Sequence, residues 1–406
     1  MTASRFPGIL TLIVFATSLL ASYALWNYAR HQADHELKSE FDFQVREITS
    51  NIQQRMSAYI QVLYGLKAYF NGTEQITREE FHDYISSLRL EDQYPGIQGL
   101  GHSPLIAHDQ IQQHVAEMRR QGFPDYQIKP AGEREYYTPV IYIEPFSGRN
   151  VEALGYDTFS EANRNAAIQQ ARDTNTAAVT GKLTLVQETD KDVQAGFLVF
   201  LPLYKKGMPH ATLEQRRAGI YGWVAAVFRV GDLMAGLGNV RSVDLNLEIF
   251  DQGEISDATR MFTTDHSVAD LDSTNPRFTS IEKVQFPNRS WTIVIRSTPE
   301  FEAGFVNNTP TVVAFTGIAF SLLLTLLAHA LVRSNKIASE LGESEERWRF
   351  ALEGAGDGVW DWNLESGEVK FSKSWKKMLG YGEAEIKNRF SECESRIHPD
   401  DVDKVL

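Results

Sequence analysis

Two long runs without a charged residue limit what this chain can fold into. The first runs from Phe6 to Ala29 and the second from Ala303 to Val332. Each exceeds the roughly 20 apolar residues that a helix needs to cross a bilayer. A cleaved signal peptide is the alternative for the first run, but its apolar part would be only about 7 to 15 residues long. We therefore predict retained transmembrane helices at residues 6–29 and 303–332.

The charges beside the second run predict its orientation. Arg333 and Lys336 follow the run, whereas Glu300 and Glu302 precede it. Basic residues concentrate on the cytoplasmic side of membrane helices, so the C-terminal end of this helix is expected in the cytoplasm. The protein is then a multi-pass protein of the inner (plasma) membrane. Residues 1–5 and the C-terminal part are cytoplasmic, and one large periplasmic or extracellular domain lies between the spans.

The composition outside these runs excludes several classes of function. A net charge of -13 without any cluster of Lys and Arg argues against a nucleic-acid partner, because binding phosphates requires such clusters. The single cysteine, Cys393, excludes an intrachain disulfide and a zinc site built from several thiolates. His31 and His35 have metal-ligand spacing but no further ligands nearby, so we predict no metal and no cofactor.

Residues 30–70 read as a long stalk helix. Apolar residues recur along it at spacings of three and four, which is the pattern of a helix with one buried face. This face either packs on the helix's own domain or forms a homodimer stalk continuous with the membrane helix, and we favour the homodimer. The pattern consists of Leu37, Phe41, Val45, Ile48, Ile52, Met56, Leu63, Leu66 and Phe70.

The sequence pattern of residues 71–302 is typical of an α+β domain. Thr77 and Glu80 form a capping-box pattern before a helix. Short segments rich in aromatic and branched residues, typical of strands, follow Pro95 in two clusters, before and after Gly207, and suggest two packed subdomains. A helix from Ser160 to Asp173, opened by Ser160, interrupts the first cluster. The motifs G-x-S-x-G, H-E-x-x-H and the P-loop are not found.

Several of these segments together resemble one family. YTPVIYIEPF from Tyr137, then ALGYD, AVTGKLTLVQE and GFLVFLPLY, in this order, resemble the core of the CHASE family of extracellular sensor domains. The similarity extends over about residues 70–299. It implies two PAS-like antiparallel-sheet subdomains stacked on the stalk helix between two membrane spans. It also implies binding of a small extracellular ligand.

The resemblance points to three candidate ligand-binding residues. Asp157 occupies the place of an aspartate that recognises the adenine ring in plant cytokinin receptors, which share this domain. Val179 falls where an apolar residue lines the pocket, and Glu188 falls where those receptors have a threonine. Two carboxylates would suit a ligand with a cationic or hydrogen-donating group. Alternatively, Asp157 only caps the following helix and Glu188 points to solvent.

The C-terminal part reads as a signalling module. Residues 333–349 form a charged linker helix, and residues 350–406 resemble the first half of a PAS domain. A strand in VWDWNL, a turn at Glu365 to Gly367, a second strand in VKFSKS and a short helix from Trp375 to Leu379 are expected. The later strands of a PAS sheet are missing, so the protein is expected to continue. His398 and Cys393 sit in no haem or flavin motif.

The sequence thus predicts a membrane receptor subunit in which a small ligand, bound outside, biases the second membrane helix and the PAS module. The output domain would lie beyond Leu406 and be a histidine kinase or a cyclic-di-GMP cyclase or phosphodiesterase, since these residues carry no catalytic domain. The alternative is a short non-enzymatic membrane protein that heterodimerises with a complete receptor.

Overall fold

The structure is a computed structural model that describes residues 6–188, 192–237, 244–264, 276–304, 307–401 and 404. The chain divides into two compact units. One unit combines residues 1–31 with residues 308–406, and the other comprises residues 32–307. The first therefore holds the first apolar run, most of the second and the C-terminal module, whereas the second holds the predicted sensor domain.

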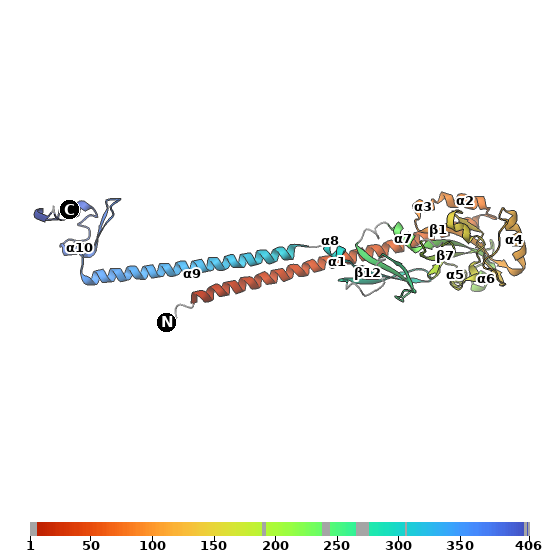
Figure 1. Cartoon of the computed structure of the whole chain (residues 1–406), viewed down its shortest axis with the longest axis horizontal. Helices are drawn as coiled ribbons and strands as arrows, with labels where there is room; N and C mark the ends of the chain where they lie inside the picture. The colour runs from red at the N-terminus through yellow and green to blue at the C-terminus, as the bar shows by residue number, and fades with distance from the viewer. Residues whose placement is uncertain are drawn as a thin grey trace. The chain divides into compact units, whose positions relative to one another are not determined.

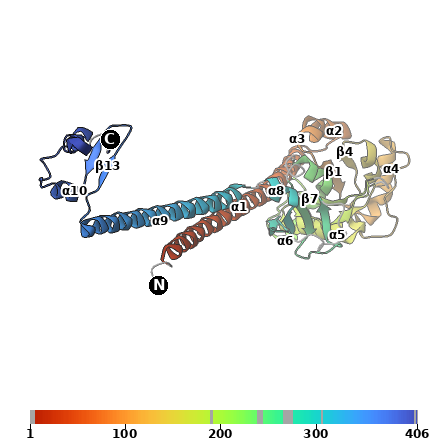
Figure 2. The ribbon, with the colours of Figure 1, turned by 60° about the vertical axis from the view of Figure 1, so that its left-hand side comes forward.

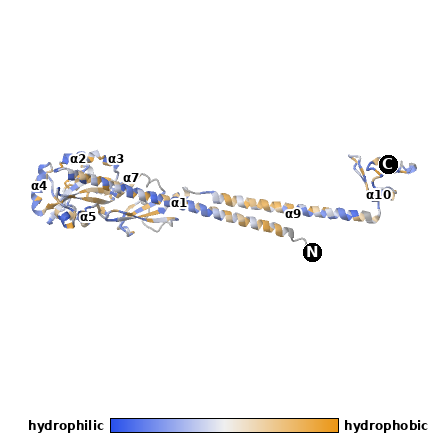
Figure 3. Ribbon diagram, turned by 180° about the vertical axis from the view of Figure 1, so that it is seen from behind, coloured by the Kyte–Doolittle hydropathy of each residue, from blue (hydrophilic) through white to orange (hydrophobic). Residues whose placement is uncertain are grey.

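Both apolar runs form helices. Helices α1 (Phe6–Gly72) and α9 (Thr309–Ala355) each contain a stretch long and apolar enough to cross a membrane, coloured orange in Figure 3. The predicted stalk and linker are continuous with these helices. The second helix begins at Thr309 rather than at the predicted Ala303, because Pro310 occupies its first turn and Ala303 belongs to the short helix α8 (Pro299–Gly304).

The two apolar helices touch through small side chains. The Ser22 hydroxyl donates to the Gly317 carbonyl at 3.1 Å and lies 3.2 Å from the Ser321 hydroxyl. A Cβ atom placed on Gly317 would approach the Ser22 Cβ to 2.8 Å. The missing side chain at Gly317 therefore lets the two backbones come close, as small residues do between membrane helices.

The C-terminal module has the predicted hairpin. Strands β13 (Trp360–Trp362) and β14 (Val369–Phe371) pair antiparallel, with Gly367 at a φ of +69° in the turn. The expected short helix follows as α10 (Lys373–Met378), and α11 (Phe390–Glu394) and the 3-10 turn η4 (Pro399–Asp401) come next. The hairpin and the short helix are thus confirmed.

The apolar face of the stalk is buried within its own domain. Ile48 is 4% exposed and Ile52 is 1% exposed, and both join a core that includes residues of both sheets. All nine residues of the predicted pattern are buried in this core. The helix therefore packs on its own domain, which was the first of the two interpretations. The homodimer seam that we favoured is already covered, because one copy of the chain buries this face by itself.

A six-stranded antiparallel sheet forms the first part of the unit that comprises residues 32–307. Its order is β4-β1-β8-β7-β5, with β6 also paired to β7. Figures 1 and 2 show α5 beside this sheet, and α1 packs on the opposite face. The strands are β1 (Ile97–Pro104), β4 (Tyr142–Glu144), β5 (Ala178–Val179), β6 (Leu183–Thr184), β7 (Ala195–Tyr204) and β8 (Ile220–Arg229).

A four-stranded antiparallel sheet follows, in the order β10-β9-β12-β11. Its inner face joins the same core as the stalk helix, through residues such as Ile249 and Trp291. These strands are β9 (Leu245–Asp251), β10 (Arg260–Thr263), β11 (Thr279–Gln285) and β12 (Ser290–Ser297), and a separate small pair is made by β2 (Ile106–Ala107) and β3 (Tyr136–Tyr137). Two antiparallel sheets with segregated helices make the unit α+β, as predicted.

Short helices connect the strands. The predicted capping box opens α2, with Thr77 and Glu80 bonding each other's backbone. Helix α5 buries Ala167, Ile168 and Ala171 but begins later than predicted, because Glu161, not Ser160, accepts from its first amides. The helices are α2 (Arg78–Ser87), α3 (Leu90–Gln93), η1 (His108–Gln110), α4 (Ile111–Arg120), η2 (Gly148–Ala153), η3 (Thr158–Ser160), α5 (Ala162–Thr174), α6 (Leu213–Gly219) and α7 (Val230–Gly236).

Candidate functional site

An interior cavity lies on the α5 face of the six-stranded sheet. Its floor is made by alternate residues of the central strands, because successive side chains of a strand point to opposite faces. Its volume is about 30 Å³, room for one or two water molecules but not for a larger ligand. The floor consists of Gly101, Ser103, Leu198, Phe200, Ala225 and Val227.

Arg164 is the charged residue of the cavity wall. It is 4% exposed, and its guanidinium donates to the Tyr156 hydroxyl at 3.0 Å and to the Thr184 carbonyl at 3.2 Å. Glu161 lies 3.5 Å away and compensates part of its charge. The burial of Arg164 could have been predicted from the sequence. Arg164 precedes Ile168 and Ala171 by four and seven positions and so lies on the same buried face of the helix.

Asp157 is completely buried and holds the segment before α5. Its Oδ1 accepts from the Thr138 amide at 2.8 Å and from the Phe159 amide at 3.1 Å. Its Oδ2 is buried without a hydrogen-bond partner among the described residues and lies 3.4 Å from Nη1 of Arg134. Asp157 therefore caps the short turn η3, while its neighbours Tyr156 and Thr158 line the cavity.

Glu188 forms a buried ion pair with Arg229, at the edge of a network that reaches two exposed carboxylates. Its Oε1 accepts from Nε of Arg229 at 2.8 Å, and Arg229 also bonds Asp192 and Asp232. These carboxylates raise the pKa of Arg229 against the effect of its burial. Glu188 is thus directed to Arg229 rather than to solvent, while the preceding residue, Gln187, lines the cavity.

Val179 lies on the other face of the sheet from the cavity. It pairs with Val199 of β7 and joins the core against α1, whereas its neighbour Ala178 pairs with Phe200 and faces α5. The structure thus brings Asp157 and Glu188 next to wall residues of the cavity and places Val179 behind it. Contact of these three residues with a ligand stays a prediction.

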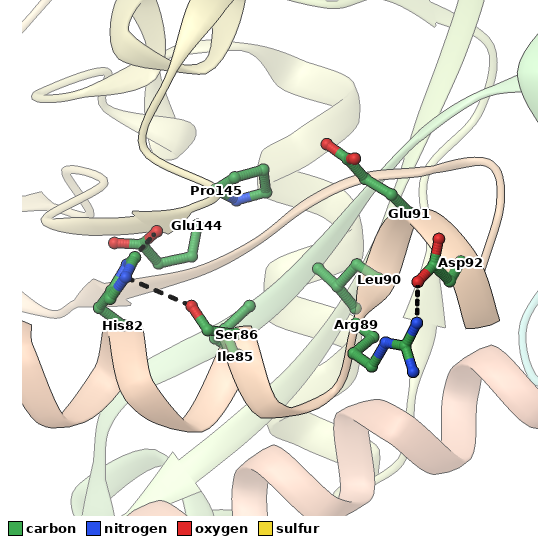
Figure 4. Close-up of a pocket in the computed structure, with 9 residues that line it drawn as sticks. All are labelled: His82, Ile85, Ser86, Arg89, Leu90, Glu91, Asp92, Glu144 and Pro145. Carbon is green, nitrogen blue, oxygen red and sulfur yellow. Dashed lines mark hydrogen bonds and ion pairs between the residues drawn. The ribbon is translucent and has the colours of Figure 1, made fainter.

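A second hollow of about 280 Å³ opens between α2, α3 and the end of β4 (Figure 4). Nδ1 of His82 lies 3.0 Å from Oε2 of Glu144, and its Nε2 lies 3.3 Å from the Ser86 hydroxyl. The hydrogen bond to Glu144 and its charge raise the pKa of His82. Nearby, Arg89 pairs with Asp92.

No metal centre is found in the part of the chain that the structure describes. No group of three or more His, Cys, Asp or Glu side chains there could hold a metal ion. The remaining features define an α+β domain with an interior cavity, carried on a long helix whose other end is apolar enough for a membrane.

Comparison with known proteins identifies this domain. Residues 74–262 match the CHASE domain, the family that the sequence motifs resemble. The chain is also similar to hybrid signal transduction histidine kinase A of Dictyostelium discoideum, with 20% identity over 408 residues. The similarity covers 89% of this chain but only 19% of the relative, so the chain spans about a fifth of that protein's length. Both findings support a sensory protein of signal transduction.

Proposed function

We propose that this protein is a membrane receptor whose CHASE domain binds a small molecule outside the cell or in the periplasm. The observation that carries the proposal is the CHASE match at residues 74–262, placed in sequence between two helices of membrane length. The charges around the second helix favour cytoplasmic termini. Binding would bias α9 and pass the signal to the C-terminal module, which we take to be part of a PAS domain. The subdomains on the two sheets are proposed to be PAS-like as well.

The topology can be tested with the single native cysteine. Intact cells would be treated with a membrane-impermeant maleimide before and after permeabilisation. We expect Cys393 to react only after permeabilisation, whereas a cysteine introduced as Ser57→Cys in a Cys393→Ser background should react in intact cells, since Ser57 is exposed on α1. Labelling of Cys393 in intact cells would overturn the proposed orientation.

The ligand site is proposed to be the cavity on the α5 face of the six-stranded sheet. In its present closed form the cavity admits only water, so binding requires the segment from η2 to α5 to move outward. Arg164 offers a buried donor, which favours a ligand with a hydrogen-bond acceptor. Asp157 and Glu188 would then act mainly by holding the walls through their bonds to Thr138 and Arg229.

Native mass spectrometry of the full chain, purified in lipid nanodiscs, tests this site. We expect wild-type protein to retain a bound small molecule and the cavity-filling variant Ala225→Phe to lose it. Ala58→Phe, the same change at an exposed position of α1, serves as the control. Equal retention of the molecule by all three proteins would rule out this cavity.

The receptor is further proposed to act as a homodimer and to drive an output domain, either a histidine kinase or a cyclic-di-GMP enzyme. The buried face of α1 is already covered, so the exposed face with Phe43 and Tyr64 is the candidate contact. Cysteines at Phe43 should crosslink in membranes, while cysteines at Ile52 should not. If neither position crosslinks, the stalk dimer is ruled out.

A further inference from the structure

A large hollow lies on the face of the six-stranded sheet opposite the interior cavity. Its volume is about 780 Å³. It opens between the end of α1, the segment from Thr73 to Arg78, α4 and the strands β1 and β8. On β1, Gly101 and Ser103 line the interior cavity, whereas His102 between them lines this hollow. The two sites are therefore separated by the sheet.

His102 is the central polar group of the hollow. It is 5% exposed, and its Nδ1 lies 3.0 Å from the Trp223 carbonyl. A carbonyl oxygen can accept a hydrogen bond but cannot donate one. Nδ1 must therefore carry the proton, and burial lowers the pKa of His102 to about 4, so the ring is neutral at physiological pH. Its Nε2 is then an acceptor, and no hydrogen-bond partner for it is found among the described residues.

Aromatic rings surround this acceptor. The His102 ring centroid lies 4.6 Å from that of Phe70, 6.0 Å from Tyr142 and 6.4 Å from Tyr221. The Tyr142 hydroxyl donates to the Ile76 carbonyl, but the Tyr221 hydroxyl has no hydrogen bond within the described residues. The hollow thus offers flat apolar walls with one free acceptor and one free hydroxyl.

The charges of the lining narrow the ligand class. Glu74 and Glu117 are carboxylates of the wall, and Glu117 pairs with Arg120 at the surface. Among the described lining residues Arg78 is the cation: its Nη2 donates to the Ile141 carbonyl at 2.6 Å and its guanidinium lies 4.4 Å from the Phe123 ring centroid, while its Nη1 is buried without a hydrogen-bond partner among the described residues. The wall thus carries two carboxylates and one guanidinium, so its charges disfavour an anionic ligand, and the His102 acceptor favours a ligand that donates a hydrogen bond.

We propose that this hollow is a second ligand site, for a flat hydrogen-bond-donating molecule that is neutral or cationic, such as a heteroaromatic amine. The donor of the ligand bonds Nε2 of His102, its body packs against Phe70 and Tyr142, and the Tyr221 hydroxyl supplies a further hydrogen bond. The site goes beyond the proposed function, because it does not use the cavity on the α5 face.

Calorimetric titration of the full chain in lipid nanodiscs, with empty nanodiscs as blanks, tests the site with three probes. Indole carries one neutral donor, tryptamine adds an ammonium group, and indole-3-acetate adds a carboxylate. We expect tryptamine and indole to bind more tightly than indole-3-acetate. Tighter binding of indole-3-acetate would overturn the ligand class, and the absence of binding by every probe at about millimolar concentration would overturn the site.

Two variants test the contacts. Tyr221→Phe removes a hydroxyl that bonds no described residue, so folding should be unchanged while indole affinity falls severalfold. His102→Phe keeps a ring but removes the acceptor, and affinity should fall by about tenfold. Tyr64→Phe and His108→Phe, the same changes outside the hollow, should bind as wild type does. Unchanged affinity in both test variants would overturn the proposal.

Ala225→Phe distinguishes the two sites. This substitution fills the interior cavity and should leave binding of indole in the hollow unchanged. If it abolishes indole binding while His102→Phe does not, the probe occupies the interior cavity and the second site does not exist. If the proposed receptor function is wrong, the titrations with His102→Phe and Tyr221→Phe still test the second site, because they measure binding and not signalling.

Discussion

The side chain of Asn288 pairs with the backbone of Val179 as a strand would. The Val179 amide donates to Oδ1 of Asn288 at 2.7 Å, and Nδ2 of Asn288 donates to the Val179 carbonyl at 3.0 Å. Val179 belongs to β5 at the edge of the six-stranded sheet, and Asn288 lies in the turn before β12 of the four-stranded sheet. The two sheets are thereby joined beside the strand that borders α5.

Asn288→Ala should loosen this junction. The variant leaves the buried Val179 amide without its partner, so we expect faster hydrogen exchange at that amide. We also expect a loss of about 1 to 2 kcal/mol in the free energy of unfolding. Mass spectrometry of peptides covering residues 176–182 measures the exchange. Asn71→Ala, at an exposed position of α1 outside the junction, is the control, and exchange in Asn288→Ala as slow as in wild type would contradict the interpretation.

Asp157→Ala should destabilise the unliganded domain. Three hydrogen bonds reach Oδ1, from the Thr138 amide and hydroxyl and from the Phe159 amide. Bonds to a charged acceptor contribute more than neutral ones, so a loss of about 3 kcal/mol is expected. Thermal unfolding measures it, and Asp157→Asn, which keeps Oδ1, should lose less. An unchanged melting temperature combined with lost ligand stabilisation would instead mark Asp157 as a ligand contact.

The pair of Glu188 and Arg229 should show strong coupling. Removing Arg229 leaves the buried carboxylate of Glu188 with only Arg149, whose Nη1 lies 3.5 Å away, so Arg229→Ala should cost about 3 to 5 kcal/mol. Glu188→Gln should be destabilising as well, while the double variant should cost clearly less than the sum of the two. Chemical unfolding of wild type, the two single variants and the double variant measures this coupling as a double-mutant cycle. Strict additivity would show that the 2.8 Å contact contributes no pairwise energy.

The pair of His82 and Glu144 should make stability depend on pH. Folding raises the pKa of His82, so the contribution of the pair is complete below the unfolded-state value of about 6.5. It is lost as the pH rises through the higher folded-state value. The melting temperature of wild type relative to His82→Gln should therefore decrease between mildly acidic and mildly alkaline pH. A constant difference would contradict this.

The contact between α1 and α9 should be testable in membranes. In a Cys393→Ser background, Ser22→Cys with Ser321→Cys should form a disulfide, because the two hydroxyl oxygens lie 3.2 Å apart. Adding Gly317→Leu should abolish the crosslink, since the new side chain occupies the contact. Leu20→Cys with Leu323→Cys, both exposed, is the negative control. Crosslinking that persists with Gly317→Leu would contradict this packing.

The sequence by itself determined the elements whose signals are local. The apolar runs, the capping box at Thr77, the buried face of α5 and the C-terminal hairpin depend on residues close in the chain, and short-range periodicity and turn chemistry identify them. The motifs of the first strand cluster likewise indicated the CHASE domain.

Only the tertiary structure decided which surfaces and side chains meet. The periodicity of α1 is the same for a dimer seam and for a helix on its own domain, and packing against both sheets chose the latter. Pairing of β5 with β7 decided that Val179 faces away from the cavity, since a shift of one residue reverses a side chain's direction. Glu188 meets Arg229, and Asp157 meets Thr138, although neither pair is close in the sequence or follows a local pattern. Only the fold brings these side chains together.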